Sequence, residues 1–312
     1  MRDLVVLRCF RDYEPWPWTS CWSATVDVME CELKMIEQCW LFHCGYSRVP
    51  EPAVFEDGNP ASLKRMPFLC VLLVHETLGP ILIDAPFGHE GPNNAGALLG
   101  QFLKKTGTSF ESKWAVSARV EQLGFRPSQV NNVLMTHLHF DHTGGMKAFS
   151  HAVFRMNKKE WNFANSIGVF DALRLGYVVG DFRALKAKTE LFGVPKYFER
   201  DVEGHDVFGD GSVEAISLPG HSIGHTGYRF RLPDGRRVFF VGDAIFNVGH
   251  VKDRGLGMMP KYFGRHRSDV EFTVEELQRY AKMYPDEVFI CSHDFDWGER
   301  CMSGPVAVHV SL

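Results

Sequence analysis

Short apolar runs separated by turn residues fill the chain from about residue 36 onward. Runs rich in Val, Ile, Leu and Phe lie at 36–46, 68–76, 81–87, 131–137 and 151–157, and then at 213–221, 226–232, 237–244 and 287–293. Such runs are typical of buried strands. Leu78–Pro80 and Pro233–Gly235 each lie between two runs and predict hairpins. The polar stretch 46–66 contains three prolines and predicts a loop.

Helical spacing of apolar residues appears in three other places. Residues 114–123 predict a helix that Gly124 ends, and residues 158–193 look helical and partly amphipathic. Thr273 and Glu276 fit a capping box for a helix that Pro285 stops. Strands and helices are mixed rather than strictly alternating, so we expect an α/β fold with two sheets and helices packed outside them.

Composition and charge narrow the class of protein. The 312 residues are 45% hydrophobic and 23% charged, with a formal net charge of −4, as in a soluble globular enzyme without a basic face for nucleic acid. No apolar run reaches about 18 residues, so no membrane span is expected. The first residues make a poor signal peptide, and the eight cysteines form no CxxC pair. A cytoplasmic protein with reduced, partly buried thiols is therefore expected.

The first 34 residues differ from the rest of the chain. They contain three tryptophans and two prolines between Pro15 and Trp22, and they supply no metal-type motif. Met35 stands immediately before the first regular strand. Residues 1–34 are either an extension outside the catalytic domain or a segment whose tryptophans pack on it. The catalytic domain itself is predicted to span residues 35–312.

The sharpest chemical feature is the segment THLHFDH at 136–142. It follows an apolar strand, and alternate residues of extended chain point the same way, so His137 and His139 can meet one ion. Asp141 and His142 come just after them, where a turn can aim them at a second ion. Neutral imidazole and carboxylate are suitable zinc ligands.

Three later strands end in the same kind of residue. His221 follows the run at 213–218, Asp243 follows the run at 237–241, and His293 follows the run at 287–291. If these strand ends gather at one edge, one metal receives His137, His139 and His221. The other metal receives Asp141, His142 and His293. Asp243 can bridge the two, because a carboxylate has two oxygens.

The ordered set HLHFDH, PGHSIGH, GD and SH resembles the metallo-β-lactamase superfamily over about residues 35–312. This resemblance implies a four-layer αβ/βα sandwich with a dinuclear site at one sheet edge, usually filled by two Zn²⁺, with other divalent metals open. N-acyl homoserine lactonases show the most similar pattern. They usually carry a tyrosine three residues beyond the bridging aspartate, where this chain has Phe246, which cannot donate a hydrogen bond to a substrate carbonyl.

The resemblance implies hydrolysis of a small ester or lactone by attack of a metal-bound hydroxide. Asp141 is both a ligand and a proton shuttle in this hypothesis. A thioesterase of the glyoxalase II type and a phosphodiesterase or phosphotriesterase stay open, because the same geometry serves all three reactions. A non-catalytic metal-binding module is the rival from another class. A small-molecule substrate, with no nucleic-acid or membrane partner, is expected, and a homodimer is left open.

Overall fold

The computed structural model describes residues 36–91, 100, 103, 107–193, 204–264 and 267–308. These residues belong to one compact unit that extends from Leu33 to Leu312. The prediction about residues 1–34 lies outside the described residues. A catalytic domain that begins at residue 35 therefore stays a prediction.

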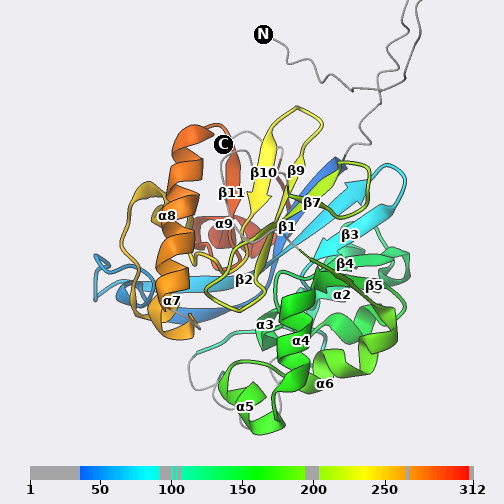
Figure 1. Cartoon of the computed structure of the whole chain (residues 1–312), viewed down its shortest axis with the longest axis horizontal. Coiled ribbons are helices and arrows are strands. Elements are labelled where there is room, and N and C mark those ends of the chain that lie inside the picture. Colours follow the sequence, from blue (N-terminus) through cyan, green and yellow to red (C-terminus); the bar gives the residue numbers. More distant parts are fainter. Residues whose placement is uncertain are drawn as a thin grey trace, which may run out of the picture. The chain divides into compact units, whose positions relative to one another are not determined.

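The strands form two sheets (Figure 1). The first has the order β12-β1-β2-β3-β4-β5-β6, antiparallel from β12 to β3 and parallel from β3 to β6. Its strands are β1 (Ile36–Pro50), β2 (Leu63–His75), β3 (Gly79–Ile83), β4 (Asn132–Leu134), β5 (Val153–Asn157), β6 (Thr189–Phe192) and β12 (Val306–Ala307).

The second sheet has the order β11-β10-β9-β8-β7, and only its β10–β11 pair is parallel. Its strands are β7 (His205–Asp206), β8 (Val213–Ser217), β9 (Thr226–Arg231), β10 (Arg237–Phe240) and β11 (Val288–Ile290). Because β9 runs antiparallel to both of its neighbours, β8, β10 and β11 all end at the same edge.

Helices cover the outer faces of the sheets (Figure 1). The α-helices are α2 (Val116–Gln122), α3 (Phe140–Thr143), α4 (Lys158–Ser166), α5 (Val169–Arg174), α6 (Val179–Phe182), α7 (Met258–Phe263), α8 (Arg267–Met283) and α9 (Phe295–Arg300). The short 3-10 helices are η1 (Glu51–Ala53), η3 (Ser112–Trp114), η4 (Pro127–Gln129), η5 (Met146–Phe149), η6 (Arg183–Lys188), η7 (Val248–Lys252) and η8 (Cys301–Ser303). Among the described residues, no helix has the length and apolar character needed to cross a bilayer.

Three apolar clusters lie between the four layers and pack them together, which confirms the αβ/βα sandwich. One cluster lies between the sheets and joins side chains such as Leu41 and Val71 to Tyr228 and Phe240. A second packs the first sheet against the helices α2, α4 and α6. The third packs the second sheet against α8. Strand β2 is buried on both faces because alternate residues serve the first two clusters.

Several sequence predictions are confirmed, and others need correction. The hairpins at Leu78–Pro80 and Pro233–Gly235 are present, and Gly124 follows the predicted helix with φ +85°. The predicted loop 46–66 is too long, because β1 extends to Pro50 and β2 begins at Leu63. The helical prediction for 158–193 is wrong at its end, where Thr189–Phe192 pair with β5 as an edge strand.

The predicted capping box at Thr273 is also wrong. Helix α8 already includes Arg267, and its buried stripe of Val270, Val274 and Leu277 has helical spacing that starts upstream of Thr273. The Thr273 hydroxyl donates instead to the carbonyl of Pro219 at 2.5 Å. It thereby holds the loop that precedes His221.

Five cysteines lie within the described residues, and all five are buried free thiols. They are Cys39, Cys44, Cys70, Cys291 and Cys301. Burial raises the pKa of the Cys44 thiol to about 12. These residues therefore pack as small apolar side chains, as the sequence predicted.

The Tyr228 hydroxyl makes a buried link between the two sheets. It donates to the carbonyl of Met135 at 2.8 Å, two residues before His137. Removing this donor leaves a buried carbonyl without its partner, so we expect Tyr228→Phe to lower the free energy of unfolding by about 1–3 kcal/mol. Urea unfolding measures this loss. Tyr262→Phe, at an exposed position on α7, should change it little, and an equal effect of the two variants would contradict the assignment.

Candidate metal centre

The segment that follows β4 carries four of the seven proposed ligands. The chain leaves the sheet after Leu134, bends at Thr136 and enters helix α3 at Phe140, with His139 in extended conformation just before the helix. Two backbone bonds fix this path: Thr226 N donates to the carbonyl of Thr136 at 2.9 Å, and Ala85 N donates to the carbonyl of His142 at 2.9 Å. The segment is thus tied to the second sheet at one end and to the loop after β3 at the other.

The other three proposed ligands follow strands of the second sheet. His221, Asp243 and His293 come shortly after β8, β10 and β11, which end at one edge. Ser292 N donates to the carbonyl of Gly242 at 3.0 Å, so the last two loops run side by side. The structure therefore brings all seven side chains to one place.

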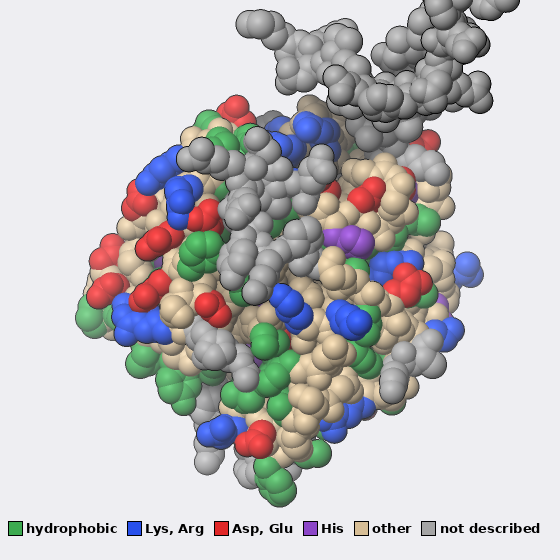
Figure 2. Space-filling view, in the orientation of Figure 1, with side chains coloured by type: hydrophobic (Ala, Val, Ile, Leu, Met, Phe, Trp, Pro, Cys, Tyr) green, Lys and Arg blue, Asp and Glu red, His purple; other side chains and the backbone are tan. Residues whose placement is uncertain are grey.

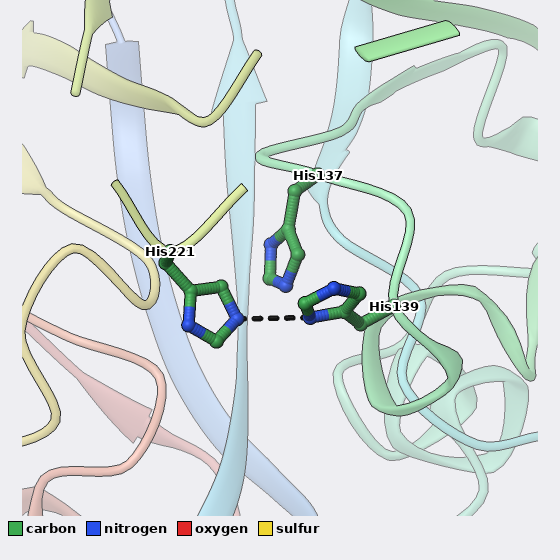
Figure 3. Close-up of side chains that lie close together, drawn as sticks. All are labelled: His137, His139 and His221. Atoms are coloured by element: carbon green, nitrogen blue, oxygen red, sulfur yellow. Dashed lines mark hydrogen bonds between the residues drawn. The ribbon is translucent and has the colours of Figure 1, made fainter. Parts of the chain in front are cut away.

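His137, His139 and His221 form the first cluster, and their ligand atoms all lie within 4.8 Å of one another. Figure 3 shows the three imidazole rings turned toward a common centre. His139 Nδ1 and His221 Nε2 are 2.9 Å apart. Two nitrogen lone pairs this close need either a proton or a cation between them.

Asp141, His142, Asp243 and His293 form the second cluster, with ligand atoms again within 4.8 Å. Asp243 Oδ2 lies 3.0 Å from His293 Nε2 and 3.3 Å from His221 Nε2. Asp243 Oδ1 lies 3.3 Å from His142 Nε2. The Asp243 carboxylate therefore lies between the clusters and faces both.

The chemistry of these atoms fits divalent cations. His137 Nε2, His142 Nε2 and Asp243 Oδ1 are buried without a hydrogen-bond partner, and such atoms are costly unless something binds them. Burial lowers the pKa of His139 to about 3 and that of His137 well below its usual range, so both rings are neutral and offer lone pairs. A set of imidazoles and carboxylates is the donor set that zinc takes.

Around the second cluster the carboxylates favour positive charge. Burial opposes a charge on His293, but Asp243 and Asp141 outweigh it and raise the pKa of the ring. Burial likewise opposes a charge on Asp243, and the surrounding histidines still hold its pKa well below the usual range. The negative charge of Asp243 and Asp141 would therefore stabilise a cation bound at this cluster.

Asp84 fixes the orientation of two of the rings, and the sequence prediction missed it. Its carboxylate accepts from His142 Nδ1, Thr136 N and Thr136 Oγ1, each at 2.8 Å. Thr136 Oγ1 lies 3.0 Å from His137 Nδ1, so both rings turn Nε2 toward the centre. Asp84 has φ +65° directly after β3. An aspartate after a strand is common, so this position carries no specific signal for a metal site.

Glu160, near the start of α4, ties together the two loops of the first cluster and was also missed. Its Oε1 accepts from Leu138 N at 3.1 Å and from the Tyr177 hydroxyl at 3.0 Å. Its Oε2 accepts from Ser222 Oγ at 2.7 Å and from Gly224 N at 3.0 Å. A Cβ on Gly224 would lie 2.3 Å from the Glu160 backbone nitrogen, so only glycine allows this approach.

His225 and His293 are each held by the backbone. His225 Nε2 accepts from Asp243 N at 3.0 Å, and the ring lies outside both clusters. His293 Nδ1 donates to the carbonyl of Pro67 at 2.8 Å, so its Nε2 points to Asp243.

Phe246 forms an apolar wall beside both clusters. Its ring centroid lies 5.0 Å from that of His293 and 5.7 Å from that of His221. The side chain is buried and packs in an apolar cluster with Phe55, Met66 and Phe295. This wall therefore presents a ring and no hydrogen-bond donor to the site.

Comparison with known proteins finds a family model, sequence relatives and solved structures that agree with one another. The model of the metallo-beta-lactamase superfamily matches residues 71–293. The chain is 29% identical over 179 residues to the N-acyl homoserine lactonase AttM of Agrobacterium fabrum, a match covering 57% of this chain and 63% of that lactonase. The chain thus spans less than two thirds of the length of this relative.

Two solved structures share the fold. A structure of N-acyl homoserine lactone hydrolase with the product N-hexanoyl-L-homoserine at its catalytic metal centre has a TM-score of 0.65 and 19% identity, covering 87% of this chain and all of that one. The dizinc quorum-quenching lactonase AidC has a TM-score of 0.56 and 16% identity, covering 84% of this chain and 91% of that one.

We expect Glu160→Gln to loosen the loops of the first cluster. An amide offers one acceptor oxygen to four donors, so the free energy of unfolding should fall by about 2 kcal/mol. Amide hydrogen exchange at Leu138 and Gly224 should also speed up. The control is Glu287→Gln, a buried carboxylate just before β11 that accepts from the Tyr280 hydroxyl of α8. Unchanged exchange at Gly224 in Glu160→Gln would contradict the assigned role.

Proposed function

The chain belongs to the metallo-beta-lactamase superfamily, and on that premise we propose that it is a metal-dependent hydrolase of a small ester or lactone. The observation that carries the proposal is the pair of ligand clusters with Asp243 between them. Lactonase relatives support the choice of substrate class. On the face in Figure 2, Lys and Arg are interspersed with Asp and Glu, which fits a small-molecule substrate better than a polyanion.

We propose that His137, His139 and His221 hold one divalent ion, that Asp141, His142 and His293 hold a second, and that Asp243 contacts both. Zinc is the proposed metal, because nitrogen ligands outnumber carboxylates in the set. Two such ions would supply the Lewis acidity that polarises a carbonyl and lets a water molecule lose its proton near neutral pH.

Two side chains of the protein are proposed to orient the ligands and to transfer the proton. Asp84 keeps His137 and His142 in the tautomer that presents Nε2. Asp243 is nearly fully buried, whereas Asp141 is the more exposed carboxylate, with 12% of its side chain accessible. Asp141 is therefore the carboxylate that a substrate can reach. We propose that it takes a proton on an oxygen and returns it to the leaving alkoxide.

Phe246 shapes the substrate side of the site. Its ring covers His221 and His293 and limits water beside them. Because the ring has no hydroxyl group, this wall donates no hydrogen bond to a substrate carbonyl. We infer that the preferred substrate differs from an N-acyl homoserine lactone in the group that lies against Phe246.

A hydrolysis screen of zinc-loaded protein tests the proposed reaction. The panel contains lactones, aryl esters, thioesters and phosphoesters, and turnover should be highest for a lactone or an ester. A preference for a thioester would favour the thioesterase alternative, and a preference for a phosphoester would favour the phosphodiesterase or phosphotriesterase. Absence of turnover on all four classes, with two zinc ions bound, would support the non-catalytic metal-binding module.

We expect Asp141→Asn to lower kcat by about 100-fold or more with little change in KM, because the amide keeps an oxygen but cannot carry the proton. Elemental analysis in parallel checks that both metals remain. Asp171→Asn, on the exposed surface of α5, is the matched control and should retain full activity. Near wild-type turnover of Asp141→Asn with both metals bound would show that the proton takes another route.

Phe246→Tyr tests the missing donor. A hydroxyl group at this wall adds one hydrogen bond to a developing oxyanion, so kcat/KM for N-acyl homoserine lactones should rise by about tenfold. Phe263→Tyr adds the same group at a half-exposed position on α7 and should change nothing. If Phe246→Tyr folds and binds metal but leaves lactone hydrolysis unchanged, the substrate carbonyl does not approach this ring.

A further inference from the structure

A cavity lies apart from the two ligand clusters. It has a volume of about 580 Å³, and none of its lining residues belongs to either cluster. Residues of β1, β2, η3, α2 and η8 surround it, including Tyr46, Arg65, Lys113, Trp114, Arg119 and Gln122. The proposed hydrolase reaction makes no use of these residues.

The charges around this cavity do not balance. Arg65 pairs with Glu299, and Lys113 pairs with Glu111 at 2.7 Å. Arg119 is only 3% exposed, and no carboxylate of the described residues forms an ion pair with it. The side chains that bond to Arg119 are neutral, since burial, together with Arg119 itself, lowers the pKa of His43 to about 3. The charge of Glu111 also acts on Arg119, but Glu111 is paired with Lys113. The cavity therefore has one uncompensated positive charge.

Arg119 keeps part of its hydrogen-bonding capacity. Nε donates to the carbonyl of His43 at 3.0 Å, one terminal nitrogen donates to His43 Nε2 at 2.9 Å, and the other donates to Gln122 Oε1 at 2.9 Å. A guanidinium has five N–H groups, so two remain without an acceptor among the described residues. A buried cation with spare donors is costly unless an anion pairs with it.

Aromatic rings line the same cavity. The ring centroids of Tyr46 and Trp114 are 5.9 Å apart with a 44° angle between the planes. The two rings pack against each other and form one aromatic side of a cavity whose lining is otherwise mostly polar. A flat apolar body can lie against that side. A single excess charge and two spare N–H groups match one carboxylate, whereas a phosphate dianion would need more positive charge.

From this arrangement, we propose that the cavity binds a small planar monocarboxylate, with its carboxylate on Arg119 and its apolar body against Trp114 and Tyr46. The proposal does not depend on the hydrolase activity. Helix α2 would then bind a ligand through Arg119 and Gln122, while its apolar residues pack on the first sheet.

Benzoate is the probe, and benzamide is its neutral counterpart of the same shape. Calorimetric titration of the zinc-loaded protein should show benzoate binding with a Kd in the millimolar range and benzamide binding at least tenfold weaker. Equal binding of the two compounds, or no binding of either, would overturn the proposal. Benzoate can also bind zinc, so the variants below must separate the two sites.

Arg119→Gln should weaken benzoate binding at least tenfold, and His293→Ala, which removes a ligand of the metal centre, should leave it unchanged. The reverse pattern would place benzoate at the metals and refute the cavity site. Arg119 also holds the β1 backbone, so circular dichroism must show that the variant folds. If it does not fold, Trp114→Leu takes its place and should weaken benzoate binding about fivefold, and unchanged binding would refute the site.

Discussion

The Asp243 carboxylate is the constraint on which the site depends. Its two oxygens lie within 3.3 Å of ring nitrogens of His142, His221 and His293, and these rings come from three separate loops. The surrounding imidazoles hold the pKa of this buried carboxylate well below the usual range. The negative charge of Asp243 lies between these three loops and favours their close approach.

The surrounding fold supplies rigid acceptors for the groups that turn away from the centre. Asp84 binds one ring directly and one through Thr136, Glu160 joins the loops of His139 and His221, and backbone groups hold His225 and His293. Asp84, Glu160 and Pro67 are buried, so a ring or loop that turned away from these acceptors would leave a buried polar atom without its partner. The ligand atoms are therefore oriented before any metal binds.

Local sequence patterns predicted two sheets with helices outside them and seven ligand-type residues at strand ends, because periodicity and ligand spacing are local features. The four-layer sandwich followed from the family resemblance. They did not predict Asp84 or Glu160, whose roles depend on contacts with residues far along the chain, such as Ser222. The wrong start of α8 has a similar cause: Thr273 looks like a cap in sequence, but its hydroxyl meets Pro219 across the fold. Strand β6 was missed because pairing with β5, and not local propensity, makes it a strand.

Anomalous diffraction from crystals of the zinc-loaded protein, recorded on both sides of the zinc absorption edge, would locate the metals directly. We expect two zinc peaks about 3.5–4 Å apart, with Asp243 in contact with both. One peak should lie within reach of His137, His139 and His221, and the other within reach of Asp141, His142 and His293. A single peak, or two peaks of which Asp243 contacts only one, would contradict the shared carboxylate and the dinuclear centre built on it.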